Sequence, residues 1–267
     1  MRQLLPLVLL ALVSAGYAQA PEEATLSVAD FESGSAWSGG SGDKGGVGKS
    51  EIVATEAHGG KQCLAFHYDF SGTTGTAFIY ARVQPKLALR GTPSKLTFWV
   101  KGDGSGRPLT VRLTEARGEV WQRSLGQLDF TDWRRMTVPI TSQGAFSWAG
   151  PQDKTRGVLD LPVRLTDIIV DKASETAPAT GVIHLDDFSL TTVMAPQDRY
   201  DVKIDAPGLT ISDSARTQTI TAKLSVVSAY SKDAEADVTW RLVDYRGRRI
   251  ESGRGAVKVP ASGTVQI

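Results

Sequence analysis

The fold is decided by residues 95–125, which read KLTFWVKGDGSGRPLTVRLTEARGEVWQRSL. Apolar and polar side chains alternate within residues 95–101, 108–114 and 118–125; Gly, Asp, Ser and Arg fill the gap between the first two runs, and Pro108 begins the second. Period-two alternation is typical of strands that bury one face, while glycine and proline mark turns. The stretch therefore predicts three successive β-strands joined by short turns.

The same pattern recurs along the first two thirds of the chain. No window there shows a sustained apolar stripe at the 3.6-residue period of a helix. About ten strand-like runs at regular spacing predict an all-β antiparallel sandwich or jelly roll. The runs are Thr25–Phe31, Ser50–Thr55, Gln62–Phe70, Thr76–Val83, Lys95–Lys101, Pro108–Thr114, Gly118–Leu125, Trp133–Ile140, Arg164–Val170 and Gly181–Leu190.

A second, smaller domain is predicted after the segment Val193–Pro196. It resembles an immunoglobulin-like or fibronectin-like β-sandwich, in which Trp240 would be the buried tryptophan. Residues 196–267 are fewer than the about 100 that such a fold takes. We therefore expect an incomplete sandwich at the front of a longer protein, with a genuinely short sandwich as the alternative. Its runs are Asp201–Ile204, Thr217–Val227, Ala236–Asp244, Ile250–Ser252 and Ala256–Val259.

Residues 1–20 have the composition of a secretory signal peptide. Arg2 is followed by the apolar run Leu4–Val13 and by the small-x-small sequence Ala18-Gln19-Ala20. An apolar run of about ten residues is too short to span a hydrocarbon core of about 30 Å. We expect a chain that is secreted, periplasmic or on the cell surface, with no membrane span.

Charge and cysteine content exclude further classes. The formal net charge is +1 and no basic block stands out, so the sequence predicts no nucleic-acid partner. Cys63 is the only cysteine, so no disulfide can form within the chain. Stability must then come from the core or from a metal ion, and Cys63 itself is predicted to be a buried, inert thiol.

One motif imitates a nucleotide-binding site. Residues 44–50 read KGGVGKS, nearly the deviant phosphate-binding loop of ParA/MinD-like ATPases. Such a loop works where a buried strand leads into the start of a helix. Residues 35–43 are rich in Gly and Ser, and the β-branched run Glu51–Thr55 follows. We therefore expect a surface loop and no bound nucleotide.

Short motifs over about residues 25–192 carry a family resemblance. They are Asp30–Glu32, Gly60–Leu64, Tyr68–Gly72, Leu96–Gly104, Leu128–Arg134 and Ile183–Phe188. Their order and spacing resemble the galactose-binding-like carbohydrate-binding modules of bacterial secreted glycoside hydrolases and surface proteins. The resemblance implies a jelly-roll β-sandwich over residues 21–195 and a polysaccharide or glycan as partner.

The resemblance also implies a structural calcium ion between the first and last strands of the module. Carried onto this sequence, the ligands would be Glu32, Asp30, the backbone carbonyl of Lys61, and Asp186. Calcium prefers six to eight oxygen ligands, and these groups are all oxygen donors. The alternative is that the acidic residues only cap strand ends in solvent.

Alternation suggests which side chains would bind a sugar. Aromatic rings stack on the C–H faces of pyranose rings, and charged groups bind hydroxyls. If the non-core faces of the strands share one sheet, we expect an open surface that His67 and Asp69 could join. The alternative is that Trp99 belongs to the core. The predicted surface consists of Tyr80, Arg82, Trp99, Arg112, Trp121 and Arg123.

No catalytic arrangement is recognisable in the sequence. His58, His67 and His184 lack metal-binding spacing, and no GxSxG elbow is present. We therefore predict a non-catalytic carbohydrate-binding module at the N-terminal part of a larger polysaccharide-active or cell-surface protein, in which a glycoside hydrolase domain would follow. Two alternatives remain: structural or adhesion sandwiches without a sugar site, or a jelly-roll polysaccharide lyase or glycosidase.

Overall fold

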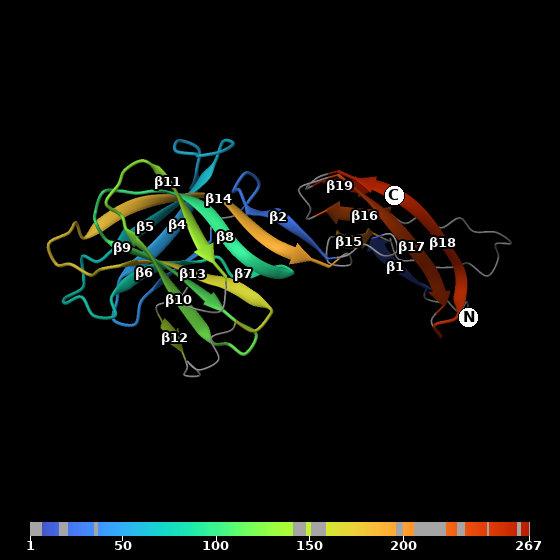
Figure 1. The fold of residues 1–267 in the computed structure, drawn as a ribbon, viewed down its shortest axis with the longest axis horizontal. Helices are drawn as coiled ribbons and strands as arrows, with labels where there is room; N and C mark the ends of the chain where they lie inside the picture. The colour runs from blue at the N-terminus through green and yellow to red at the C-terminus, as the bar shows by residue number, and fades with distance from the viewer. Residues whose placement is uncertain are drawn as a thin grey trace, which may run out of the picture. The chain divides into compact units, whose positions relative to one another are not determined.

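The computed structural model describes residues 7–15, 21–34, 37–140, 148–150, 159–195, 200–205, 223–228, 233–244, 246–260 and 263–266. Within these residues the chain is all-β (Figure 1). The described residues contain no helix that is long and apolar enough to cross a membrane. The chain divides into two compact units, residues 25–193 and residues 1–24 with 194–267.

The first unit contains two β-sheets. The six-stranded sheet has the order β11-β8-β14-β5-β4, with β2 also paired to β14. The neighbouring strands β4–β5, β5–β14, β14–β8 and β8–β11 are all antiparallel. The strands are β2 (Glu22–Ala29), β4 (Val47–Val53), β5 (Cys63–Asp69), β8 (Thr92–Lys101), β11 (Trp133–Pro139) and β14 (Thr180–Met194).

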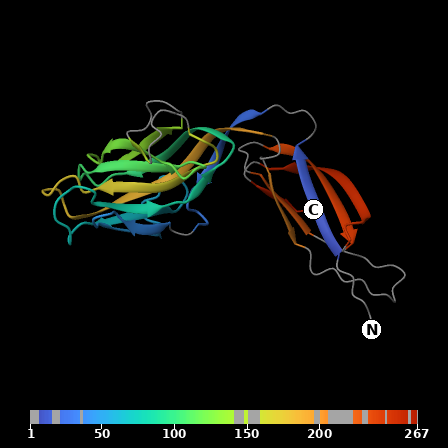
Figure 2. The same ribbon diagram turned by 90° about the horizontal axis from the view of Figure 1, so that it is seen from below.

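The seven-stranded sheet has the order β12-β10-β9-β13-β6-β3, with β7 paired to β13. Figure 2 shows β9, β13 and β6 side by side, in green, yellow and teal. The strands are β3 (Ser38–Ser41), β6 (Tyr80–Gln84), β7 (Leu87–Leu89), β9 (Pro108–Thr114), β10 (Val120–Gln127), β12 (Trp148–Gly150) and β13 (Val163–Asp171).

The core lies between the two sheets and follows the predicted alternation. Strand β8 buries Leu96, Phe98 and Val100 completely, and β9 buries alternate residues in the same way. Each buried leucine, isoleucine or phenylalanine contributes about 1.5–3 kcal/mol of transfer free energy. The predicted jelly-roll sandwich is therefore confirmed. Its other buried side chains include Leu64, Phe66, Tyr68, Val83, Leu109, Val111, Leu113, Ile168, Val170, Ile183 and Leu185.

The KGGVGKS motif closes one edge of the sandwich. Its last residues begin β4, so a strand and not a helix follows the glycines. A Cβ atom at Gly48 would overlap the backbone carbonyl of Arg82, and one at Gly46 would approach the carbonyl of Tyr80. Glycine is needed here because β4 and β6, which belong to different sheets, touch backbone to backbone.

The second unit also contains two small sheets, β1-β17-β18 and β15-β16-β19. Its core consists of Tyr200, Leu224, Val226, Ala236, Val238 and Val259. Trp240 is 37% exposed, so the prediction that it is a buried core tryptophan is wrong. The strands are β1 (Leu7–Ala15), β15 (Tyr200–Asp205), β16 (Lys223–Ser228), β17 (Ala234–Asp244), β18 (Arg249–Val259) and β19 (Thr264–Gln266).

Candidate functional site

A connected set of polar side chains covers the outer side of the seven-stranded sheet. Pairing places Tyr80 beside Asp171, and Arg112 lies between Asp167 and Gln122. Their neighbours along each strand fill the core, so these side chains point away from it. We call this surface the polar face; it consists of Tyr80, Arg82, Gln84, Thr110, Arg112, Thr114, Gln122, Asp167, Ile169 and Asp171.

Arg112 is the centre of the polar face. Its Nε donates a hydrogen bond of 2.9 Å to Gln122 Oε1, and its Nη1 donates one of 3.2 Å to the hydroxyl of Tyr80. The guanidinium also lies 4.8 Å from the centroid of the Tyr80 ring. The Tyr80 hydroxyl donates in turn to Asp43 Oδ1 at 3.2 Å. These bonds fix side chains from β10, β9 and β6 in one arrangement.

A second group lies on β6 and β13. Asp167 Oδ1 accepts a hydrogen bond of 3.3 Å from Arg82 Nη1 and another of 3.3 Å from Gln84 Nε2. The Arg82 side chain is 30% exposed and the Asp167 side chain 9%. The carboxylate is therefore enclosed, while the guanidinium keeps an edge that a ligand can reach.

Asp171 is the acidic group with a perturbed pKa on the polar face. Burial raises the pKa of its carboxyl above the usual value. The hydroxyl of Thr110, which donates to Asp171 Oδ2 at 3.3 Å, and the positive charge of Arg112 act in the opposite direction. The surface is thus close to charge balance, with two arginines facing two aspartates.

The structure brings three of the six predicted sugar-binding residues together. Tyr80, Arg82 and Arg112 lie on the polar face, although Tyr80 is only 5% exposed. Trp121 and Arg123 do not, because β10 pairs them with Leu113 and Val111, whose side chains fill the core. Trp121 is accordingly buried.

Trp99 lies on the other sheet. It belongs to β8, and the imidazole of His58 stacks on its indole with ring centroids 3.9 Å apart. His58 also meets Trp133 edge-on and holds Asp187 Oδ2 at 2.7 Å from its Nδ1. One face of Trp99 is therefore occupied by a loop side chain.

Sequence reasoning predicted three of the ten residues of the polar face and missed the other seven. Gln84, Thr110, Gln122, Asp167 and Asp171 had no distinguishing motif, because each is an ordinary polar residue of an alternating strand. Register alone places them beside Arg82 and Arg112. Assigning the outward face of β10 to Gln122, and not to Trp121 and Arg123, would have identified one of them.

Two of the predicted metal ligands, Glu32 and Asp186, contact the loop of residues 58–62, to which Lys61 belongs. Glu32 Oε1 accepts hydrogen bonds from the amides of Lys61 and Gln62, at 2.7 and 2.9 Å. Asp186 Oδ2 accepts from the amides of His58 and Gly59, at 2.9 and 3.2 Å. Lys61 therefore contacts Glu32 through the Lys61 amide nitrogen, whereas the predicted ligand was the Lys61 carbonyl oxygen. Asp30 remains exposed and accepts the amide of Glu32 at 3.2 Å.

Asp186 carries the chemistry that would favour a cation. Its side chain is completely buried, and the pKa of its carboxyl is raised by that burial. In the described residues its hydrogen bonds come from backbone amides and no cationic side chain pairs with it. Oxygen donors of this kind suit calcium, but no group of three acidic, histidine or cysteine side chains gathers in the described part of the chain. Carbonyl and water oxygens would have to complete the coordination.

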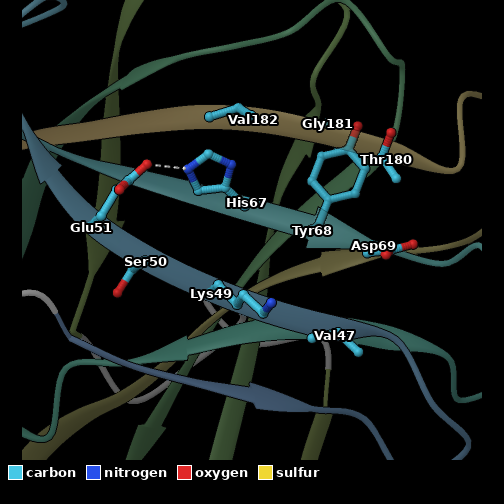
Figure 3. Close-up of a pocket in the computed structure, with 10 residues that line it drawn as sticks. All are labelled: Val47, Lys49, Ser50, Glu51, His67, Tyr68, Asp69, Thr180, Gly181 and Val182. Atoms are coloured by element: carbon cyan, nitrogen blue, oxygen red, sulfur yellow. Dashed lines mark hydrogen bonds and ion pairs between the residues drawn. The ribbon is translucent and has the colours of Figure 1, made fainter.

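A hollow of about 630 Å³ lies on the outer side of the six-stranded sheet (Figure 3). Figure 3 shows Glu51 and His67 facing one another across β4 and β5, with Oε1 and Nε2 3.0 Å apart. His67 and Asp69 therefore lie on the sheet opposite to the polar face. The hollow is lined by Val47, Lys49, Ser50, Glu51, His67, Tyr68, Asp69, Thr180, Gly181 and Val182.

Comparison with protein families gives one match, to the model described as "Carbohydrate binding domain (family 11)", over residues 17–193. Among curated proteins, a mannan endo-1,4-beta-mannosidase of Bifidobacterium adolescentis is 29% identical over 126 residues. That alignment covers 46% of this chain but 12% of the mannosidase, so the chain spans about an eighth of its relative's length.

Solved structures of similar chains include two family 11 carbohydrate-binding modules of Clostridium thermocellum. One comes from a cellulosomal cellulase and is 19% identical, with a TM-score of 0.44; the match covers 66% of this chain and 98% of that one. The other, determined with a β-1,3-1,4-mixed-linked tetrasaccharide, is 20% identical, with a TM-score of 0.44 and coverages of 66% and 99%.

Proposed function

The chain belongs to the family 11 carbohydrate-binding domains, and from this premise we propose that residues 25–193 bind a polysaccharide on the polar face. The observation that carries the proposal is two hydrogen-bonded pairs, Arg82 with Asp167 and Arg112 with Gln122, whose four strands are neighbours in one sheet. A sugar chain lying across these strands would meet several of these groups at once.

The chemistry of the polar face favours a neutral polymer. Arginine and carboxylate groups bind vicinal hydroxyls well, and the near balance of charge gives no net attraction for uronates or sulfates. The side chains are already held by one another, so little conformational entropy is lost when a ligand binds. We therefore propose a neutral, β-linked polysaccharide as the ligand.

Affinity electrophoresis of the full chain tests this proposal. Gels containing β-mannan, mixed-linked β-glucan or β-galactan would be compared with gels containing pectin or a sulfated galactan. We expect retardation in at least one neutral gel. Arg112→Ala should weaken binding about tenfold or more, because a charged hydrogen-bonding group is lost. Arg135→Ala, an exposed arginine on β11 of the other sheet, is the matched control and should bind normally.

A structural or adhesion role without a sugar site is the second candidate function. It is favoured by the burial of Trp121 and Tyr80 and by the stacking of His58 on Trp99, which leave the predicted rings poorly exposed. Normal migration of the wild-type chain in every gel would support this role and remove the polysaccharide proposal.

We also propose a structural calcium ion at the loop of residues 58–62, held by Asp186, Glu32 and carbonyl oxygens. The buried Asp186 carboxylate supports it, because a bound cation would supply the positive charge that the described residues lack there. A calcium ion bound both to Asp186 of β14 and to carbonyl oxygens of the loop would stabilise the folded unit.

A chelator experiment tests the calcium site. We expect EGTA to lower the melting temperature of the wild type and calcium to restore it. Asp186→Asn should abolish this response and melt below the wild type, because its NH2 group replaces one of two oxygens that accept backbone amides. Asp132→Asn, at an exposed position, is the control. A wild-type melting temperature that EGTA leaves unchanged would rule the calcium ion out.

Export of the chain and attachment to a larger polysaccharide-active protein are further proposals. The composition of residues 1–20 supports export. The match to a short part of the mannosidase supports an accessory role, in which the module keeps a catalytic domain near its polymer. The intact mass of the exported protein tests whether residues 1–20 are removed.

A further inference from the structure

The hollow on the outer side of the six-stranded sheet is built from three neighbouring strands. Register places Lys49 of β4 beside His67 of β5, and His67 beside Val182 of β14. Alternate residues of a strand point to the same side of a sheet, so the row two residues along also faces outward. Figure 3 shows both rows, of which the second consists of Val47, Asp69 and Thr180. The hollow thus combines apolar, cationic, anionic and hydroxyl groups in a small area of the sheet.

The backbone beneath the hollow is held in place. Gly181 of β14 pairs with Tyr68 of β5, and the hydroxyl of this buried tyrosine donates to Asp103 Oδ2 at 2.5 Å. A Cβ atom at Gly181 would lie 2.2 Å from that hydroxyl oxygen, so the glycine leaves room for this packing. Strands β5 and β14 are therefore joined to the loop that follows β8, and a ligand would meet a preformed surface.

The fold makes little use of the polar groups in the hollow. In the described part of the chain, Lys49 Nζ and the Thr180 hydroxyl have no hydrogen-bond partner. Glu51 and His67 contact each other, but a pair of side chains that are 63% and 41% exposed contributes about 0–1 kcal/mol. These groups are therefore available to a ligand.

Charges of both signs lie close together in the hollow. Hydrogen bonds from Ser71 and the positive charge of Lys49 lower the pKa of Asp69, so this carboxylate is ionised at neutral pH. A ligand of a single charge would be attracted by Lys49 and repelled by Asp69 and Glu51, or the reverse. Neutral hydroxyl groups avoid this conflict, because they donate to carboxylates and accept from an ammonium group.

We propose that the hollow is a second saccharide site, separate from the polar face, which binds a short neutral oligosaccharide segment. The choice of a sugar as the ligand rests on the proposed function. The volume of about 630 Å³ is within the range of about 300–1,000 Å³ that is typical of small-ligand sites. Lys49, Asp69 and Thr180 bind hydroxyl groups, while Val47 and Val182 contact the C–H groups of the sugar.

Two sites on opposite sheets let one module bind two polysaccharide segments. The polar face belongs to the seven-stranded sheet and the hollow to the six-stranded sheet, and both lie within residues 25–193. Linked sites bind a polymer more tightly than either site alone when its segments can reach both. The same arrangement would cross-link separate chains.

NMR titration of the full-length chain tests the inference, because backbone amide signals report the two faces separately. The probes are hexasaccharides of β-mannan, mixed-linked β-glucan and β-galactan. With a hexasaccharide that shifts the signals of the polar face, we expect the signals of His67 and Thr180 to shift as well, with a saturation curve of their own.

Variants locate the second site. Lys49→Ala should weaken the affinity reported by His67 and Thr180 about tenfold or more, because a charged donor is lost, and should leave the affinity of the polar face unchanged. Val182→Trp should abolish the shifts of His67 and Thr180, because the indole fills the hollow. Lys95→Ala is the matched control, since it removes an exposed lysine of β8 in the same sheet, and both affinities should stay the same.

The outcomes separate this inference from the proposed function. If a hexasaccharide shifts the signals of the polar face but not those of His67 and Thr180, the hollow is not a saccharide site and the proposed function stands. Equal affinities in Lys49→Ala and Lys95→Ala would also overturn the inference. Shifts at the hollow alone would support the second site and remove the polar face, and no shift on either face removes both proposals.

Discussion

Arg107 is a charged residue inside the sandwich. It is 1% exposed, and its Nη2 donates to the backbone carbonyls of Ala177 and Pro178 at 3.1 and 2.7 Å. Its guanidinium lies 4.7 Å from the centroid of the Phe70 ring and 5.7 Å from that of Tyr68. The side chain thus fastens the loop after β13 to the end of β5.

Arg107→Ala should destabilise the first unit by about 3–5 kcal/mol, because buried carbonyl oxygens lose their donors and a cavity opens beneath Phe70. Urea unfolding followed by tryptophan fluorescence measures this change. Arg135→Ala, on an exposed strand position, should stay within about 0.5 kcal/mol of the wild type. A loss below about 1 kcal/mol for Arg107→Ala would show that water replaces its hydrogen bonds.

Asp171 makes stability depend on pH. Burial raises the pKa of this carboxyl in the folded state. An acid with a raised folded pKa binds its proton more tightly when folded, so stability falls as pH rises from the unfolded value of about 3.9 through the folded pKa. Asp171→Asn should therefore raise the free energy of unfolding at pH 7 and have little effect near pH 3. Unfolding curves at the two pH values measure the difference, and equal effects at both would contradict it.

At the scale of elements, strand β4 shows how glycine joins two sheets. Gly48→Ala should destabilise the first unit by about 1–3 kcal/mol, because the new methyl group would collide with the backbone of β6. Gly72→Ala is the matched control, since nothing lies within 4 Å of a Cβ atom there. Thermal unfolding of the two variants provides the measurement. A Gly48→Ala variant as stable as the control would mean that the two edges can separate.

Alternation predicts which face of a strand is buried only when the strand's partner is known. It placed Leu96, Phe98 and Val100 correctly, because within residues 95–101 only apolar residues occupy that side of β8. In β10 both sides carry mixed residues, and pairing with β9 turned Trp121 and Arg123 toward the core. The sequence does not specify that register, so two of the six predicted sugar-binding residues lie on the core side of their strand.

Sheet membership is a second feature that local patterns cannot supply. Trp99 and Arg112 each lie on the strand face opposite to a set of alternating apolar side chains, so the local pattern groups them together. The strands that hold them, β8 and β9, nevertheless belong to different sheets. The family resemblance is a different kind of information, since it implied that Glu32 and Asp186 meet one loop at a calcium ion; in the structure both carboxylates accept hydrogen bonds from amides of residues 58–62, and the calcium ion stays a prediction. Long-range order of motifs contains information that period-two patterns lack.

At the scale of the whole molecule, the predicted signal peptide, residues 1–20, also contains a strand of the second unit. The structure pairs β1, within this segment, with β17 along nine residues from Leu7 to Ala15. Removal of a signal peptide would leave β17 without this neighbour, whereas the first unit, residues 25–193, has its own two sheets and core. Cleavage should therefore affect one unit and not the other.

Expression in a Gram-negative bacterial host should yield a periplasmic product whose N-terminal residue is Pro21, as measured by its intact mass. Calorimetry should then compare this product with the uncleaved chain made in the cytoplasm. The melting transition of the first unit should be the same in both, because the strands of its two sheets all lie after residue 20. The midpoint temperature of the second unit's unfolding transition should fall in the cleaved form, which loses the backbone hydrogen bonds between β1 and β17.

Gly48→Ala serves as the internal control, since it should lower only the midpoint temperature of the first unit. A product that retains residues 1–20 would contradict export by cleavage, and an unchanged second transition would show that β1 does not stabilise that unit.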